Sequence, residues 1–231
     1  MKSQPRRLTC GECLRPASLC LCPHIPRISN RTPVLVLQHQ DEQKHALNTA
    51  RLAVLGLVNA EIWIGDTFAA LPARLNAARA AYLLFPGDDA VTPDQLNRSL
   101  ATPIDHEAST PCLEHAPNLD ALDRDALNRK PIAPDLLIVP DGTWRKARRI
   151  LHANPALTPL ARLTLKPTAA STYRLRKASE PDALSTIEAI VQTLSALEPT
   201  QDFLPLLRPF DVLIEQQIAA MGSETYARNY R

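Results

Sequence analysis

A chain of 231 residues that is 45% hydrophobic and 22% charged can bury a sizeable core, as one large domain or two small ones. No segment approaches the roughly 18 consecutive apolar residues that a membrane span requires. The first residues are charged and lack the apolar stretch of a secretory signal. The sequence therefore predicts a cytoplasmic protein with no membrane partner.

The net charge of +2 conceals an uneven distribution of charge. Residues 1–31 carry six Lys and Arg against Glu12 alone, and residues 141–177 carry nine against Asp141 alone. The rest of the chain leans acidic. Two separated basic blocks predict a positive surface that attracts phosphate backbones, hence nucleic acid. The alternative is that these cations merely solvate helix faces.

The six glycines are too widely spaced for a phosphate-binding loop. Neither G-x-G-x-x-G nor G-x-x-x-x-G-K-[ST] occurs. The usual dinucleotide and P-loop sites are therefore excluded.

Four cysteines lie within thirteen residues near the start of the chain. A cytosolic protein disfavours disulfides, and four thiolates can surround a tetrahedral zinc ion. So short a segment has no core of its own, so the metal would supply its folding energy. We expect a zinc-binding segment over residues 1–31 and a separate domain over 32–231, with the ligands Cys10, Cys13, Cys20 and Cys22. Reduced or redox-active cysteines are the alternative, and His24 is a possible substitute ligand.

Strand and helix patterns alternate along the rest of the chain. Apolar runs predict strands over 34–38, 61–64, 81–85 and 135–139, and a fifth near Leu163. Helical patterns cover 44–57, 71–80, 144–152, 185–197 and 210–221, while 91–134 has helical pieces but few strand signals. This alternation predicts an α/β fold, with a mostly parallel sheet flanked by helices.

Two turns directly follow predicted strands. In parallel sheets, ligands bind beyond the carboxyl ends of the strands. Phe85-Pro86-Gly87 and Pro140-Asp141-Gly142 would lie side by side there if their strands are neighbours. Thr143 fits the N-cap of the next helix. Trp144 would either stack on a base or pack in the core with Ala147 and Leu151.

Residues 171–190 form a further pattern. Ser185 and Glu188 fit a capping box at the start of a helix. Arg174, Arg176 and Lys177 form a cationic strip that is expected to face phosphates.

These motifs occur in the order seen in DTW-domain proteins, the tRNA-uridine aminocarboxypropyltransferases, which the chain resembles over nearly its whole length. The similarity rests on the four cysteines, His39 with Glu42, Asn48-Thr49, LLFPGDDA, DGTW, YRLRK and LSTIEA. The resemblance implies a SPOUT-like, knotted fold, S-adenosylmethionine as donor and tRNA as acceptor. The product would be 3-(3-amino-3-carboxypropyl)uridine, and no obligate protein partner is implied.

The resemblance also assigns site residues. The catalytic residues would be Asp141, Thr143 and Trp144. The donor site would comprise Leu84, Phe85, Pro86, Gly87, Pro140, Asp141, Gly142, Leu184, Ser185 and Thr186. The tRNA phosphates would meet Arg145, Arg148, Arg149, Arg174, Arg176 and Lys177. The alternatives are an RNA methyltransferase of related fold and a non-catalytic, zinc-bearing RNA-binding protein.

Asp141 is a reasonable general base for the N3 proton of uridine. A helix N-terminus would stabilise its carboxylate and lower its basicity, whereas burial beside Trp144 and bound substrate would raise it. The sequence leaves open which effect dominates.

Overall fold

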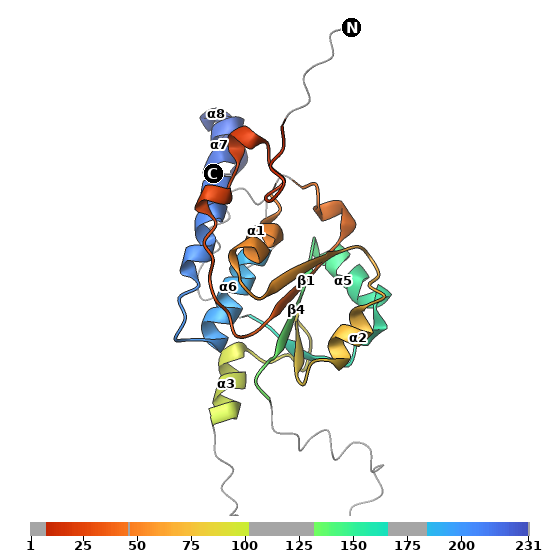
Figure 1. Cartoon of the computed structure of the whole chain (residues 1–231). Helices are drawn as coiled ribbons and strands as arrows, with labels where there is room; N and C mark the ends of the chain where they lie inside the picture. Colours follow the sequence, from red (N-terminus) through yellow and green to blue (C-terminus); the bar gives the residue numbers. More distant parts are fainter. Residues whose placement is uncertain (1–7, 46, 102–131, 166–183, 231) are drawn as a thin grey trace, which may run out of the picture.

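Five parallel strands form the centre of the molecule in the computed structural model, which describes residues 8–45, 47–101, 132–165 and 184–230 (Figure 1). The sheet order is β2-β1-β4-β3-β5. The predicted parallel α/β sheet is confirmed, and β3 and β4 are neighbours. The strands are β1 (Val34–Gln38), β2 (Ala60–Ile64), β3 (Ala81–Leu84), β4 (Leu136–Asp141) and β5 (Ala161–Leu163).

Helices cover both faces of this sheet. One face carries α1 (Thr49–Gly56), α3 (Pro93–Ala101), α6 (Thr186–Leu197) and α7 (Arg208–Met221). The other carries α2 (Leu71–Asn76) and α5 (Trp144–Ala153) (Figure 1). The helix α8 (Ser223–Tyr230) follows α7. Single 3-10 turns span Ala17–Leu19 (η1), Cys22–His24 (η2), Gln40–Glu42 (η3), Pro155–Leu157 (η4) and Leu204–Leu207 (η5).

The central strands are buried on both faces, which explains their continuous apolar sequences. Val34 and Val36 of β1 pack toward α1 and α6, whereas Leu35 and Leu37 pack toward α2 and α5. All five residues of β1 are buried, including Gln38 at its end. A polar side chain at that position requires a hydrogen-bonding partner.

Several element boundaries differ from the expected ones. The helix expected from residue 44 begins at Thr49, because the Asn48 side chain accepts a hydrogen bond from Arg51 N and caps the helix there. The helix expected over 71–80 ends at Asn76. β4 extends to Asp141, since pairing with β1 continues to that residue. The fifth strand begins at Ala161, two residues before the expected Leu163.

Two helices add detail that the sequence patterns did not resolve. The helix α3 lies at the start of the stretch 91–134, for which helical pieces were expected. Residues 102–131 of that stretch lie outside the described residues. The helix α8 was not predicted. Within the described ranges, no helix has the length and apolar character needed to cross a bilayer.

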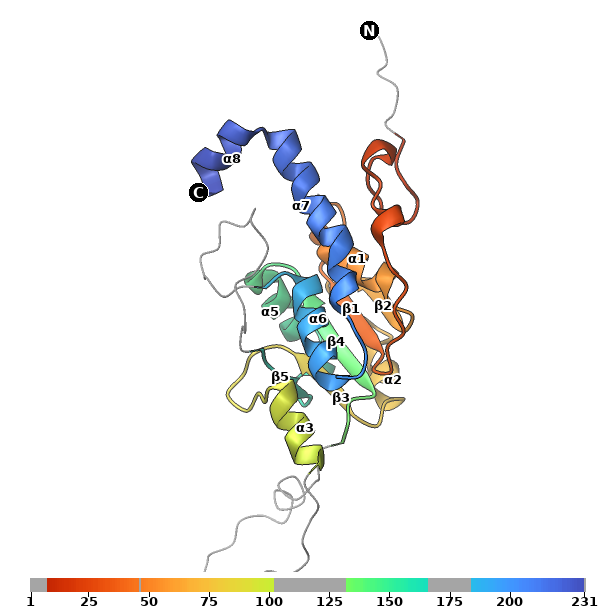
Figure 2. The same cartoon turned by 90° about the vertical axis from the view of Figure 1, so that its left-hand side faces the viewer.

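The cysteine-bearing segment lies against the helical layer of α1 and α7 (Figure 2). Leu21 is fully buried within the main core. Arg51 Nε donates to Glu12 O at 2.5 Å, and Arg15 lies 3.5 Å from Gln216 of α7. The division at residues 31 and 32 stays a prediction.

Candidate active site

Asp141 is the last residue of β4 and is only 8% exposed. It is the register partner of Gln38, the last residue of the neighbouring strand β1. Gln38 Nε2 donates to Asp141 Oδ2 at 2.8 Å, and the hydroxyl of Thr186 donates to Oδ1. Three elements, β1, β4 and the start of α6, therefore fix the orientation of this carboxyl group.

Burial raises the pKa of Asp141 above its ordinary value of 3.8. The hydrogen bonds from Thr186 and Gln38 act in the opposite direction because they stabilise the carboxylate. Desolvation outweighs them, and the nearby charge of Glu42 adds to the rise. Burial in the folded protein therefore makes Asp141 a stronger base than an ordinary aspartate.

A pair of side-chain amides connects Asp141 to α1. Gln38 Nε2 also donates to Asn48 Oδ1 at 3.0 Å, and Asn48 Nδ2 lies 3.3 Å from Gln38 Oε1. Asn48 in turn is the N-cap of α1. Gln38 was not among the predicted site residues, although a glutamine at the end of an apolar strand was a usable signal.

The turn after Asp141 has a backbone conformation at Gly142 that favours glycine. Gly142 has a φ of +145°, which side-chain-bearing residues rarely adopt, and a Cβ there would lie 3.0 Å from Lys146 Cβ. Thr143 is the N-cap of α5 and accepts a hydrogen bond from Lys146 N, so that prediction is confirmed.

Trp144 is 41% exposed, so the alternative that places it in the core with Ala147 and Leu151 is wrong. Ala147 and Ile150 are the buried residues of α5. The Trp144 ring instead packs edge-on against Phe85, with ring centroids 5.6 Å apart. This contact joins the loop after β3 to the loop after β4 and leaves part of the indole open to solvent.

Two contacts connect the predicted donor stretches. Phe85 packs against Trp144, which follows the 140–142 turn, and Thr186 bonds to Asp141, so the stretches 84–87, 140–142 and 184–186 lie near one another at the carboxyl ends of β3 and β4. Ser185 caps α6, and its capping box with Glu188 is confirmed. The structure thus assembles the expected residues without showing what they bind.

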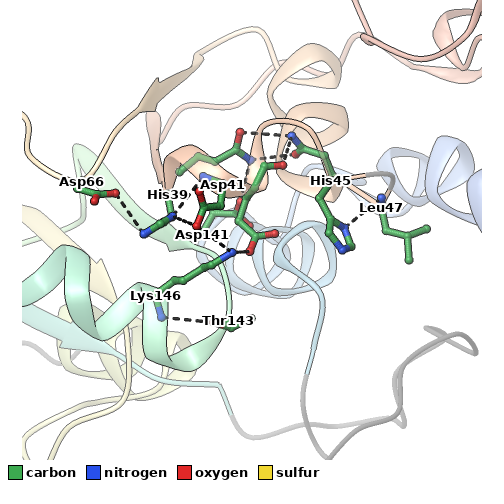
Figure 3. A network of polar contacts seen from close by, with 11 residues as sticks. His39, Asp41, His45, Leu47, Asp66, Asp141, Thr143 and Lys146 are labelled. Atoms are coloured by element: carbon green, nitrogen blue, oxygen red, sulfur yellow. Dashed lines mark hydrogen bonds and ion pairs between the residues drawn. The ribbon is translucent and has the colours of Figure 1, made fainter.

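Two ion-pair groups flank Asp141 (Figure 3). Lys146 Nζ lies 2.8 Å from Glu42 Oε1, and this bond raises the pKa of Lys146. On the other side, buried His39 Nε2 faces Asp66 Oδ1 at 3.2 Å, without the alignment of a full hydrogen bond. Asp66 also lies 3.0 Å from Arg149. Lys146 and Arg149 are therefore each paired with an acidic side chain.

The predicted RNA-binding residues divide into two groups. Arg145, Arg148 and Arg149 are exposed on α5, beside the candidate site. Arg149 is paired with Asp66, whereas Arg148 makes no hydrogen bond or ion pair with the described residues. Arg174, Arg176 and Lys177 lie outside the described residues.

The four N-terminal cysteines come together. Their sulfur atoms all lie within 4.8 Å of one another, with Cys10 and Cys22 at 3.6 Å and Cys13 and Cys20 at 3.8 Å. Four sulfurs placed tetrahedrally at 2.3 Å from zinc would be about 3.8 Å apart. The cluster therefore fits a zinc ion, and exposed His24 is not part of it.

The cluster also favours a thiolate. Hydrogen bonds from the backbone of Cys13 and Glu12 lower the pKa of Cys10 to about 6, whereas burial raises the pKa of Cys22 to about 12. Because zinc binds thiolates, backbone donors directed at Cys10 preorganise one ligand.

Comparisons with known proteins agree with this arrangement. The profile described as DTW domain matches residues 7–218, which include the cysteines, the Asp141 turn and the start of α6. No solved structure matches the chain.

Three curated relatives carry related names. tRNA-uridine aminocarboxypropyltransferase 2 of Drosophila melanogaster is 28% identical over 223 residues, covering 92% of this chain and 76% of the fly protein. The protein of the same name from Mus musculus is 28% identical over 222 residues, covering 92% and 64%. tRNA-uridine aminocarboxypropyltransferase A of Arabidopsis thaliana is 27% identical over 215 residues, covering 84% and 74%. The chain thus spans less than two thirds of the length of the mouse relative.

Proposed function

The chain belongs to the DTW domain family, and from this premise we propose that it transfers the 3-amino-3-carboxypropyl group of S-adenosylmethionine to N3 of a uridine in tRNA. The names of the relatives support the reaction class. The observation that carries the proposal is the buried carboxyl of Asp141, held by Gln38 and Thr186 at the carboxyl ends of the strands.

Asp141 acts as the general base in this proposal. The N3 atom of uridine becomes a good nucleophile only when its proton leaves, and a base is most effective when its pKa is close to the working pH. The raised pKa of Asp141 moves it in that direction. Gln38 donates to one carboxyl oxygen of Asp141 and Thr186 donates to the other. Each oxygen keeps a second lone pair that can accept the proton.

The donor would be held by residues 84–87, 140–142 and 184–186, which converge beside Asp141. S-adenosylmethionine, when bound, supplies an electrophilic side-chain carbon whose bond to sulfur breaks as the bond to N3 forms. Which carbon reacts depends on placement and not on a special side chain. The role of this chain is therefore to orient the uracil against Asp141 and to exclude water.

The neighbouring residues would bind the RNA. Trp144, partly exposed and braced by Phe85, offers a face on which a base can stack. Thr143 positions the turn by capping α5. Arg145, Arg148, Arg174, Arg176 and Lys177 would contact phosphates, and Arg149 would do so less strongly because Asp66 competes for it.

Three finer assignments belong to the same proposal. The cysteine cluster holds a structural zinc ion that stabilises the N-terminal segment. The fold is SPOUT-like and knotted, as the resemblance to the family implies. We propose that the protein acts on its tRNA substrate in the cytoplasm.

The reaction is tested with purified protein, unmodified tRNA and two forms of S-adenosylmethionine, one labelled in the methyl group and one in the carboxyl group. Nucleosides are then separated and weighed. We expect a uridine that carries the carboxyl label and the mass of a whole aminocarboxypropyl group. Incorporation of the methyl label alone would identify a methyltransferase instead, and no incorporation would favour a non-catalytic protein.

A further inference from the structure

A cavity of about 300 Å³ lies between the cysteine-bearing segment and the helices α1 and α7. Its volume is at the lower end of the range for ligand sites. None of the predicted donor residues contributes to its wall. The cavity is therefore separate from the candidate site formed by Phe85, Asp141 and Thr186.

Three cations line the cavity, Arg15, Lys44 and Arg51, and no Asp or Glu of the described residues does so. Cys13 of the cysteine cluster also lines it and interacts with the charge of Arg15, so the positive charge offered to a ligand comes from Lys44 and Arg51. A concave site with two such cations attracts an anion, and phosphate in particular.

Two of these cations are held in place by the fold. Arg15 is buried and its Nε lies 3.3 Å from Leu19 O. Arg51 donates to Glu12 O at 2.5 Å, which joins α1 to the cysteine segment. Lys44, by contrast, is exposed and makes no hydrogen bond or ion pair with the part of the chain that is described. Fixed cations reduce the entropy lost when a ligand binds.

The remaining wall is partly apolar and is connected to Asp141. Leu14 and Leu19 of the cysteine segment line the cavity, and Leu14 is 40% exposed, so it offers an apolar surface for a planar ring. Asn48 also lines it, and Asn48 Oδ1 accepts from the Gln38 Nε2 atom that bonds to Asp141. Figure 3 shows His45, another lining residue, beside this network.

We propose that this cavity binds a second nucleotide of the tRNA, a neighbour of the target uridine, with its phosphate toward Lys44 and Arg51 and its base against the leucines. This inference rests on the proposed function and adds a binding site to it. The cysteine segment is then part of the RNA site, since it supplies Leu14 and Leu19.

The test uses the full-length, zinc-loaded protein and measures its affinity for unmodified tRNA and for S-adenosylmethionine. Lys44→Glu reverses a charge at the cavity, and Arg79→Glu makes the same change at an exposed position before β3, at the other end of the strands. Gln217→Trp fills the cavity without changing its charge. If Gln217→Trp lowers the melting temperature, Gln43→Trp, at an exposed position of the cavity wall, is used in its place.

We expect Lys44→Glu and the tryptophan variant each to weaken tRNA binding about tenfold relative to Arg79→Glu, with S-adenosylmethionine binding unchanged. Equal tRNA affinities in all variants would overturn the inference while leaving the proposed function intact. Loss of S-adenosylmethionine binding would also overturn it, because the cavity would then hold the donor. Failure of the wild-type protein to modify tRNA would contradict the proposed function itself.

Discussion

Gln38 and Asp141 end two neighbouring parallel strands in register, and a 2.8 Å hydrogen bond joins their side chains. Parallel pairing places the two carboxyl ends at one edge, so the amide of one strand orients the acid of the other. The same amide contacts Asn48 at the start of α1. The position of the candidate base is thus set by the sheet and not by a loop.

The first prediction concerns Asp141→Asn. This variant keeps the size of the side chain but cannot accept the N3 proton, so the single-turnover modification rate should fall by about 10²–10⁴-fold. Binding of tRNA, measured by filter retention, should change little. Modification at the wild-type rate would remove Asp141 from the mechanism.

Asp141→Asn should also change how the stability of the folded protein depends on pH. The folded protein holds the Asp141 proton more tightly than the unfolded chain does, so wild-type stability falls as pH rises from 3.8 through the raised pKa. Asp141→Asn does not titrate there. Its melting temperature relative to wild type should therefore increase with pH over this range. A difference that is constant with pH would contradict the raised pKa.

Thr186→Val should shift the pH dependence of the reaction. The hydroxyl of Thr186 lowers the pKa of Asp141, and valine removes it at constant shape. The acidic limb of the single-turnover pH–rate profile should move to higher pH. Thr193→Val is the matched control, because the Thr193 hydroxyl bonds to Ala189 O within the same helix and does not approach the carboxyl. Similar shifts in both variants would indicate a general effect on α6.

Zinc binding is expected to depend on each cysteine of the cluster. Elemental analysis of untagged wild-type protein should find one zinc ion per chain, and Cys13→Ser should abolish it and lower the melting temperature because the segment loses its metal. Cys112→Ser, at a position outside the described residues and far from the four cysteines in sequence, should keep the full zinc content. Wild-type protein without metal would refute the zinc site.

Two arginines of α5 should differ in their contribution to RNA binding. Arg148→Ala should weaken tRNA binding and reduce the magnitude of its salt slope by about 1, as the loss of one phosphate contact does. Arg149→Ala should have a smaller effect, since Asp66 already pairs with this side chain. Binding isotherms at several salt concentrations test this. An equal or larger effect for Arg149 would show that its ion pair opens in the complex.

Much of this arrangement could be predicted from local patterns. Apolar strands, the N-caps Thr143 and Ser185, and the turns after residues 85 and 140 all follow from short-range chemistry. The four cysteines are also close in sequence. Such features require no knowledge of the path of the chain.

The remaining features depend on distant pairings. Gln38 and Asp141 are more than one hundred residues apart, and only the sheet order β1-β4 brings them together. Trp144 has a sequence position compatible with the core, yet its place just after the carboxyl end of β4 exposes it beside Phe85. The cavity between Arg15 and Arg51 likewise arises from tertiary packing.

The most direct measurement is nucleoside analysis of tRNA from cells that lack this protein and carry, on a plasmid, either the wild-type gene or Asp141→Asn. If the buried acid activates uridine N3, 3-(3-amino-3-carboxypropyl)uridine disappears in the deletion strain, returns with the wild-type gene and stays absent with the variant. Persistence of the nucleoside without the protein, or its full return with Asp141→Asn, would contradict the account.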